Sequence, residues 1–327
     1  MAKKIRDTDY LAVSAQVRAM ENTLLTRDRL EQVASARSVE EAVKVVQEFG
    51  YPDLTSAAPE AIDTAILRGR RSLQEELNLP DGRVMDIFKL KHDYHNLKAL
   101  LKSRHAGVSA DHILLDLGRV SPAELKRAVE EGEWDILPEA LAAAAREAKE
   151  ILDTTRDGQL MDIFLDRACY QEELDMARES GSDFLVGYIR RRIDSANLRA
   201  LVRTLRMKKS ADFLQQVLIP GGDVGEAEIL TVSQNEGTGL LELYAPTAFA
   251  AAAEQASLAG GALTEFERLC DDAVAEYLEM ARFVPFGEQA VIAYLAARET
   301  EFTNLRIALL GRSMDLPAEV ICARLRA

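Results

Sequence analysis

Several features that would narrow the function of this 327-residue chain are scarce in its sequence. Aromatic residues make up only 6%, and the three cysteines, Cys169, Cys270 and Cys322, show no CxxC spacing. Cysteines so far apart predict reduced thiols rather than a disulfide framework or a zinc site. No apolar run reaches the roughly 18 residues that a membrane-spanning helix needs. The basic N-terminus is interrupted by Asp7 and Asp9, so a signal peptide is not expected.

An excess of positive charge is also absent. The chain has 40 Lys and Arg against 54 Asp and Glu, which gives a net charge of −14. Because negative charge repels nucleic-acid phosphates, no nucleic-acid partner is expected. Apolar residues are abundant instead, at 48%, and the wealth of Ala, Leu, Glu and Arg is typical of helices. No stretch keeps the alternating pattern of a strand, so we expect an all-α fold.

One short pattern occurs three times: an acid, two variable residues, Asn-Leu and a base. The asparagines lie 101 residues apart (96 to 197) and then 107 (197 to 304). Such spacing predicts internal repeats of one compact protein, with helical units at residues 1–106, 107–209 and 210–327. The residues of this repeat motif are Asp93, Asn96, Leu97, Asp194, Asn197, Leu198, Glu301, Asn304 and Leu305.

On a helix, the acid of each motif is a neighbour of the asparagine three residues on and the leucine four residues on. The leucines belong to an apolar stripe, so the acid and the asparagine border a buried seam and need polar partners. The motif could be an active site used three times, or a joint that docks one unit onto the next. Repeat units cannot bury their apolar faces alone, and we therefore favour the joint.

Apolar periodicity and capping signals predict the individual helices. The glycine-rich segment Pro220–Gly225 is followed by Glu226, where a phosphate-binding loop has Lys and Ser or Thr, so we interpret it as a linker. The expected helices cover residues 10–25, 38–50, 61–77, 84–103, 121–132, 138–152, 160–178, 184–208, 246–258, 264–281 and 288–311, with a short terminal helix after Pro317.

All four histidines lie between His92 and His112. His92 followed by Asp93 resembles the pair in metal-dependent phosphohydrolases, but residues 1–91 contain no histidine to complete such a site. The other two copies of the repeat have Ile193 and Thr300 in place of His92. We therefore expect surface histidines and no metal site.

Residues 190–209 contain eight bases and a single acid, Asp194. This segment is either a solvated helix face that pairs with the acidic remainder, or a contact for an acidic partner surface or anionic head groups. No aromatic residues are interleaved with the bases, which argues against single-stranded nucleic acid. The candidate partner-contact residues are Arg190, Arg191, Arg199, Arg203, Arg206 and Lys208.

Several segments along nearly the whole chain, taken in order, carry a family resemblance. They begin with residues 10–25 and 87–98, continue with residues 159–168 and 188–199, and end with Pro285-Phe-Gly287, residues 304–306 and residues 316–325. Their order and spacing resemble the C subunit of the archaeal and bacterial V/A-type rotary ATPase, the counterpart of the d subunit of the eukaryotic V-ATPase.

The resemblance implies a funnel-shaped, all-α protein of three pseudo-equivalent helical units around a central hollow. It implies a peripheral position on the cytoplasmic side of the membrane, as a central-stalk rotor subunit that couples the shaft subunits to the membrane-embedded ion-carrying ring. Such a subunit has no catalytic residues, no cofactor and no small-molecule substrate. Two alternatives stay open, namely a helical-repeat scaffold for soluble protein partners and a metal-dependent phosphohydrolase that uses His92 and Asp93.

Overall fold

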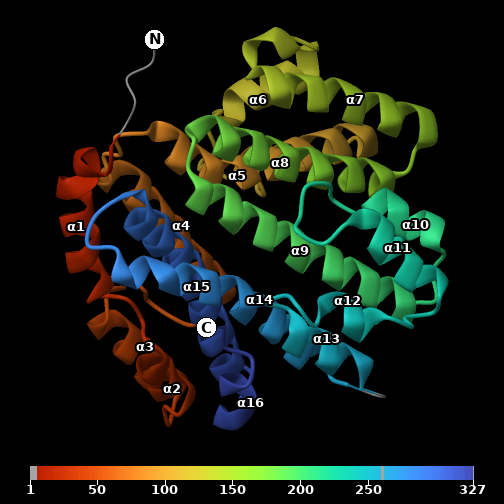
Figure 1. Cartoon of the computed structure of the whole chain (residues 1–327). Coiled ribbons are helices and arrows are strands. Elements are labelled where there is room, and N and C mark those ends of the chain that lie inside the picture. Colours follow the sequence, from red (N-terminus) through yellow and green to blue (C-terminus); the bar gives the residue numbers. More distant parts are fainter. Residues whose placement is uncertain (1–5, 259–260, 327) are drawn as a thin grey trace. The chain divides into compact units, whose positions relative to one another are not determined.

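The computed structural model describes residues 6–258 and 261–326. Within these ranges every regular element is a helix (Figure 1), which confirms the expected all-α fold. A search of the same residues for a helix long and apolar enough to cross a membrane finds none. Residues 1–5, on which the signal-peptide expectation partly rests, lie outside the described ranges. The chain divides into two compact units, Asp81–Gly239 and the combination of Met1–Pro80 with Leu240–Ala327.

The unit formed by Asp81–Gly239 is built on three long helices, with α8 in contact with both α5 and α9. Around them, α6 packs on α5, α7 packs on α8, and α10 and α11 pack on α9 (Figure 1). Leu97, Leu141 and Leu165 are fully buried in its core. The elements are α5 (Gly82–Ala106), α6 (Pro122–Glu131), η2 (Trp134–Ile136), α7 (Glu139–Thr155), α8 (Gly158–Ser180), α9 (Asp183–Arg206), α10 (Ala211–Val217) and α11 (Glu226–Gln234).

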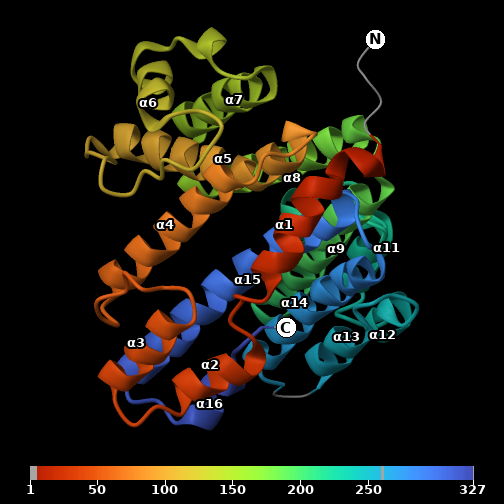
Figure 2. The same ribbon diagram turned by 90° about the vertical axis from the view of Figure 1, so that its left-hand side faces the viewer.

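The other unit combines the two ends of the chain. Its central element is α15, which contacts α1, α2, α3, α4, α14 and α16 (Figure 2). Helices from the first 80 residues therefore cover a helix that begins at residue 288. The elements are η1 (Asp7–Tyr10), α1 (Leu11–Glu21), α2 (Arg27–Ala34), α3 (Val39–Glu48), α4 (Pro59–Glu76), α12 (Leu240–Tyr244), α13 (Ala250–Ser257), α14 (Leu263–Glu279), η3 (Met280–Phe283), α15 (Glu288–Ser313) and α16 (Ala318–Cys322).

Helix α6 forms where its capping signals predict. The Ser121 hydroxyl accepts the Glu124 N–H, and the Glu124 side chain in turn accepts the Ser121 N–H. Pro122 occupies the first turn, and the helix ends at Gly132 in a left-handed conformation. These contacts satisfy backbone groups that a helix end leaves free.

The expected helix over residues 10–25 is wrong at its C-terminal end. Helix α1 stops at Glu21, and a separate short helix, α2, starts at Arg27. The eight residues of α2 are mostly polar, and Thr26 makes no side-chain capping bond. Helix α2 does bury Leu30, Val33 and Ala34 at helical spacing. The break before it could not be predicted locally, because the Leu25 N–H donates to Glu301, 276 residues away.

Candidate functional site

The nine motif residues lie on α5, α9 and α15 and are all buried. Relative exposure is 0% for Asp93 and 3% for both Asp194 and Glu301. The asparagines are at most 4% exposed, and the three leucines are completely inaccessible. A polar group in such surroundings requires hydrogen-bond partners, and each copy provides them.

Each motif asparagine binds the backbone of one residue through both polar groups of its side-chain amide. The side-chain NH₂ group donates to that residue's carbonyl oxygen, and the side-chain oxygen accepts its N–H. This paired contact fixes a segment that lies 19 residues after the asparagine in the first copy and 22 in the other two. The pairs are Asn96 with Leu115 (2.7 and 2.8 Å), Asn197 with Ile219 (2.8 and 2.8 Å), and Asn304 with Arg326 (3.1 and 2.8 Å).

Each motif acid accepts a backbone N–H from the residue directly before the N-cap of another helix. The acid thus fixes the point where that helix begins. We refer to the acid, the asparagine and the segments that they hold as a clasp. Val120 donates to Asp93 at 3.1 Å and precedes Ser121, the N-cap of α6. Val224 donates to Asp194 at 3.1 Å and precedes Gly225, the N-cap of α11. Leu25 donates to Glu301 at 3.0 Å and precedes Thr26, the N-cap of α2.

The Asp93 clasp includes a buried ion pair. Arg119 donates to Asp93 at 2.9 Å and also pairs with Glu172 at 2.8 Å, while the Tyr94 hydroxyl donates to Glu172 at 2.8 Å. Burial raises the pKa of Asp93, and the bond from Arg119 opposes that rise. The charges in this clasp are therefore arranged so that each one faces an opposite charge or a donor.

The Glu301 clasp joins the two ends of the chain. Besides the Leu25 N–H, its carboxylate accepts the Tyr51 hydroxyl and pairs with Arg298. Burial, and next the charge of Glu301, raise the pKa of Tyr51 far above its ordinary value, so this phenol stays neutral and donates. The third copy of the motif is thus completed by the N-terminal segment.

The Asp194 clasp has only backbone donors. The N–H groups of Asp223 and Val224 each lie 3.1 Å from the carboxylate. Within the described residues no side chain donates to it. Burial raises the pKa of Asp194 to about 6, the two backbone bonds and Arg191 oppose the rise, and the neighbouring charge of Asp223 adds to it. Asp223 itself pairs with Arg190 at 3.1 Å.

Two glycines let the chain approach the aspartate clasps closely. A Cβ atom at Gly118 would collide with the Asp93 carboxylate, and one at Gly222 would collide with the Asp194 carboxylate. The segment interpreted as a linker therefore does connect two helices, but its backbone also supplies the partners of Asp194. A Gly-x-Val sequence before a helix start, at residues 118–120 and again at 222–224, was the available signal for these loops.

The basic segment separates into two parts. In its first half, Arg190 pairs with Asp223, and Arg192 donates to the buried Glu173 at 2.6 Å. Arg191 and Arg199 are partly buried, whereas Arg203, Arg206 and Lys208 are exposed. Among the candidate contact residues, Arg206 and Lys208 therefore come nearest to the solvated face that the sequence suggests.

The expectation of surface histidines is wrong for His92. It is 5% exposed, because neighbouring helices cover several faces of α5. His95 is exposed, with a ring nitrogen 3.1 Å from the Ile113 carbonyl oxygen. In residues 6–258 and 261–326 no three His, Cys, Asp or Glu side chains gather in a way that could hold a metal, and Asp93 already binds Arg119 and Val120.

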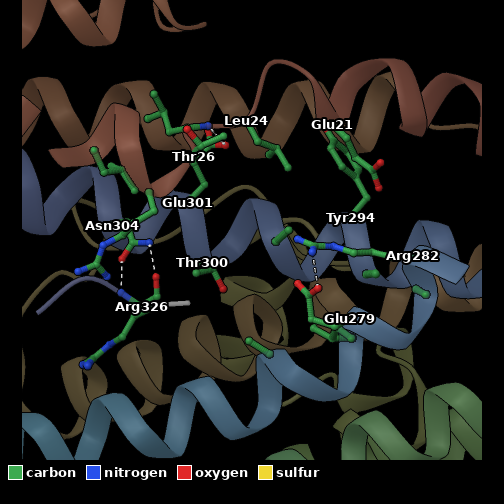
Figure 3. Close-up of a pocket in the computed structure, with 18 of the residues that line it drawn as sticks. Glu21, Leu24, Thr26, Glu279, Arg282, Tyr294, Thr300, Glu301, Asn304 and Arg326 are labelled. Atoms are coloured by element: carbon green, nitrogen blue, oxygen red, sulfur yellow. Dashed lines mark hydrogen bonds and ion pairs between the residues drawn. The ribbon is translucent and has the colours of Figure 1, made fainter. Parts of the chain in front are cut away.

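The unit that contains both chain ends also has a partly open cavity of about 680 Å³ between α1, α2, α14 and α15 (Figure 3). The charged side chains that line it already have partners: Glu279 pairs with Arg282, also in the lining, at 2.6 Å, and Arg326 pairs with Asp271, outside the lining, at 2.8 Å. Glu301 at the cavity wall belongs to the clasp. The polar groups therefore stabilise the walls rather than converge on a common point.

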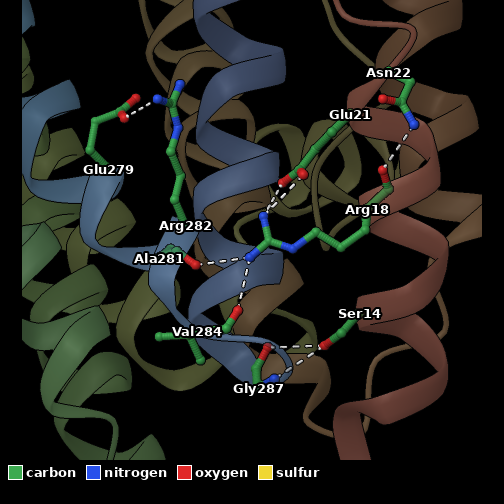
Figure 4. A network of polar contacts seen from close by, with 9 residues as sticks. All are labelled: Ser14, Arg18, Glu21, Asn22, Glu279, Ala281, Arg282, Val284 and Gly287. Atoms are coloured by element: carbon green, nitrogen blue, oxygen red, sulfur yellow. Dashed lines mark hydrogen bonds and ion pairs between the residues drawn. The ribbon is translucent and has the colours of Figure 1, made fainter.

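A polar network next to this cavity fixes the turn before α15 (Figure 4). One Arg18 nitrogen donates to the carbonyl oxygens of Ala281 and Val284 at 2.8 and 2.9 Å, while another pairs with Glu21 at 2.8 Å. The Ser14 hydroxyl exchanges hydrogen bonds with the backbone of Gly287 at 3.2 and 3.3 Å. Helix α1 thus holds the Pro285-Phe-Gly287 segment in place.

Comparison with known proteins places the chain in one family. The family described as ATP synthase (C/AC39) subunit matches residues 13–324. The C subunit of the V-type sodium ATPase of Enterococcus hirae is 24% identical over 322 residues, covering 97% of this chain and 98% of that protein. The C subunit of the A-type ATP synthase of Thermococcus kodakarensis is 25% identical over 324 residues, covering 94% and 88%.

A further relative, the C subunit of the V-type ATP synthase of Deinococcus radiodurans, is 24% identical over 349 aligned positions that cover all of this chain and 94% of the relative. Identity is low in every case, but the alignments extend over almost the full length of both partners. The family match covers all nine motif residues of this chain. The chain therefore belongs to the ATP synthase (C/AC39) subunit family.

Proposed function

We propose that this chain is a non-catalytic central-stalk subunit of a V/A-type ATPase, which couples the rotating shaft to the membrane-embedded ion-carrying ring. The observation that carries the proposal is the family match from residue 13 to residue 324, together with relatives that are named as the C subunits of V-type and A-type enzymes. In this role the chain transmits torque between two protein partners, and ATP chemistry and ion passage belong to other subunits.

The clasps support a mechanical role. A coupling part must transmit force without yielding, and each clasp ties a helix start to a motif helix through buried hydrogen bonds whose loss would leave unsatisfied polar groups. The carboxylates of Asp93, Asp194 and Glu301 are occupied by these bonds. Each carboxylate therefore serves as a structural acceptor within its clasp.

The repeated clasp also supports three pseudo-equivalent helical units. In each copy, an acid and an asparagine on a long helix hold two further segments of the chain. Three such units around a hollow would form a funnel, with one opening for the shaft and one base for the ring. We place this funnel on the cytoplasmic side of the membrane, as a peripheral part of the complex.

Co-purification tests this function directly. The tagged full-length chain is expressed in its own organism, membranes are solubilised in mild detergent, and the captured proteins are identified by mass spectrometry. We expect the nucleotide-binding, shaft and ring subunits of a rotary ATPase. Capture of soluble proteins alone, with all ATPase subunits left in the flow-through, would favour a scaffold for soluble partners and sink the proposal.

A further inference from the structure

The C-terminal end of α9 and the residues after it concentrate positive charge. Residues 201–210 include four bases and no acid, on a chain whose net charge is −14. Arg206, Met207, Lys208 and Lys209 are all exposed, and Met207 keeps 63% of its accessible surface. We refer to these four residues as the α9 tip.

Ion pairing distinguishes the α9 tip from the rest of the basic segment. Arg190 and Arg192 are paired with Asp223 and Glu173. In contrast, no acid of the described residues pairs with Arg206 or Lys208. Their charges are therefore directed at solvent, where they remain available to a partner.

The backbone of the α9 tip is fixed. The Lys208 N–H donates to Leu205 at 3.2 Å and the Lys209 N–H donates to Thr204 at 3.0 Å, so the helix closes with a tight turn. Lys208 adopts a left-handed conformation with φ of 50°. The Lys209 ammonium group lies 6.0 Å from the centre of the Phe213 ring. A surface whose backbone is already ordered loses less entropy on binding.

We propose that the α9 tip docks onto a carboxylate-rich surface of a protein partner in the ATPase complex; this inference rests on the proposed function. Arginine and methionine together are typical of protein interfaces. Lipid recognition uses clusters of about four to eight bases on a surface that anionic head groups can approach, whereas the α9 tip has three bases and belongs to an acidic chain. A small basic site on a chain of net charge −14 therefore favours a compact acidic patch on a protein as its partner, rather than a membrane surface.

A purely structural role predicts a different outcome. Bases at a helix C-terminus interact favourably with the helix dipole, which contributes to the stability of the isolated chain. If that were the only role of Arg206 and Lys208, their replacement would lower the melting temperature and leave assembly unchanged. Docking predicts the reverse, because the contact exists only in the complex.

The test uses a double charge reversal, Arg206→Glu with Lys208→Glu, in the full-length chain. The matched control is Arg37→Glu with Arg156→Glu, which changes the net charge equally at exposed positions. Arg156, like Lys208, follows a helix in a left-handed conformation, with φ of 56°. Each variant is co-expressed with the rotary ATPase subunits of its own genome, and its incorporation into the purified complex is measured at two salt concentrations.

We expect the α9-tip variant to lose affinity for the complex by about tenfold or more at moderate salt, and the wild type to weaken as salt increases. The control should assemble like the wild type. Assembly of the α9-tip variant at the wild-type level would overturn this inference and leave the proposed function standing. Failure of the wild type itself to assemble would overturn the proposed function, and this inference with it.

Two further measurements complete the test. Thermal melts of the isolated proteins show whether each variant folds. If the double charge reversal does not fold, Arg206→Gln with Lys208→Gln replaces it, and this variant should also lose affinity for the complex. Flotation with vesicles that contain anionic phospholipid tests the lipid alternative. Vesicle binding that depends on the α9 tip, combined with normal assembly of the α9-tip variant, would contradict the docking proposal.

Discussion

Among the three motif acids, Asp194 has the least favourable surroundings for a negative charge. Asp93 faces Arg119, and Glu301 faces Arg298 and the Tyr51 hydroxyl. Asp194 accepts two backbone N–H groups, with Asp223 close by. Burial therefore dominates its titration. The second clasp should consequently respond to pH in a range where most aspartates remain ionised.

The pH dependence of stability has a definite sign. The pKa of Asp194 is about 6 in the folded chain against an ordinary value of 3.8, so its contribution is fully present below about pH 4 and is lost as the pH rises through 6. The shift corresponds to about 3 kcal/mol in total, of which roughly 1 kcal/mol is lost between pH 5 and 7. Urea unfolding across this range should show a shallower pH dependence in Asp194→Asn than in the wild type.

The control for this experiment is Asp212→Asn, which removes an exposed carboxylate close to the same segment. It should keep the wild-type pH dependence. Identical slopes for the wild type and Asp194→Asn would show that Asp194 does not titrate in this range.

Glycine is required where the loops meet the aspartates. Gly118→Ala and Gly222→Ala would each push a methyl group into a clasp carboxylate, and we expect a loss of about 1–3 kcal/mol in the free energy of unfolding. Gly82→Ala is the matched control, because a Cβ atom there meets open space. Denaturant melts of the three variants suffice, and a Gly222→Ala variant as stable as Gly82→Ala would contradict the close approach.

At the scale of single elements, the asparagine contacts should be energetically alike. Replacing Asn96, Asn197 or Asn304 by alanine leaves one backbone N–H and one carbonyl without their partner, and we expect each change to cost about 2 kcal/mol. Asn22→Ala, at a surface position, should change stability by less than about 0.5 kcal/mol. Chemical denaturation measures the free energy of unfolding of all four variants. A motif asparagine whose replacement costs as little as that of Asn22 would contradict the stabilising role of its clasp.

The motif helices could be predicted from sequence because the repeat is local. An acid, an asparagine and a leucine within five residues specify one helix face, and α5, α9 and α15 form where the pattern indicates. The partners of these residues could not be predicted in the same way. The bond from Leu25 to Glu301 spans 276 residues, and no local pattern specifies such a distance.

Side-chain environment was also harder to predict than element type. His92 is buried although the other copies of the repeat do not retain a histidine, because burial on α5 depends on how many helices pack around it. In the sequence, the bases of residues 190–209 look alike. The structure separates them, since Arg192 pairs with the buried Glu173 whereas Lys208 is exposed to solvent. Both outcomes depend on tertiary contacts.

At the scale of the whole molecule, the two compact units differ in how the chain builds them. Asp81–Gly239 is continuous, whereas the other unit needs residues from both ends. We expect residues 81–239 to fold alone, with a cooperative thermal transition followed by circular dichroism. Residues 1–80 should remain largely unfolded alone, because α15, which α1 to α4 contact, is missing. A cooperatively folded 1–80 fragment would contradict this division.

Under the proposed function, the chain couples ATP hydrolysis to ion movement without performing either step. The most direct measurement removes the chain from the organism's ATPase, follows ATP-driven ion uptake into membrane vesicles, and adds the purified chain back. We predict that uptake is lost while the detached soluble sector still hydrolyses ATP, and that the added chain restores uptake. Ion uptake that is unchanged in the absence of the chain would contradict the proposed coupling function.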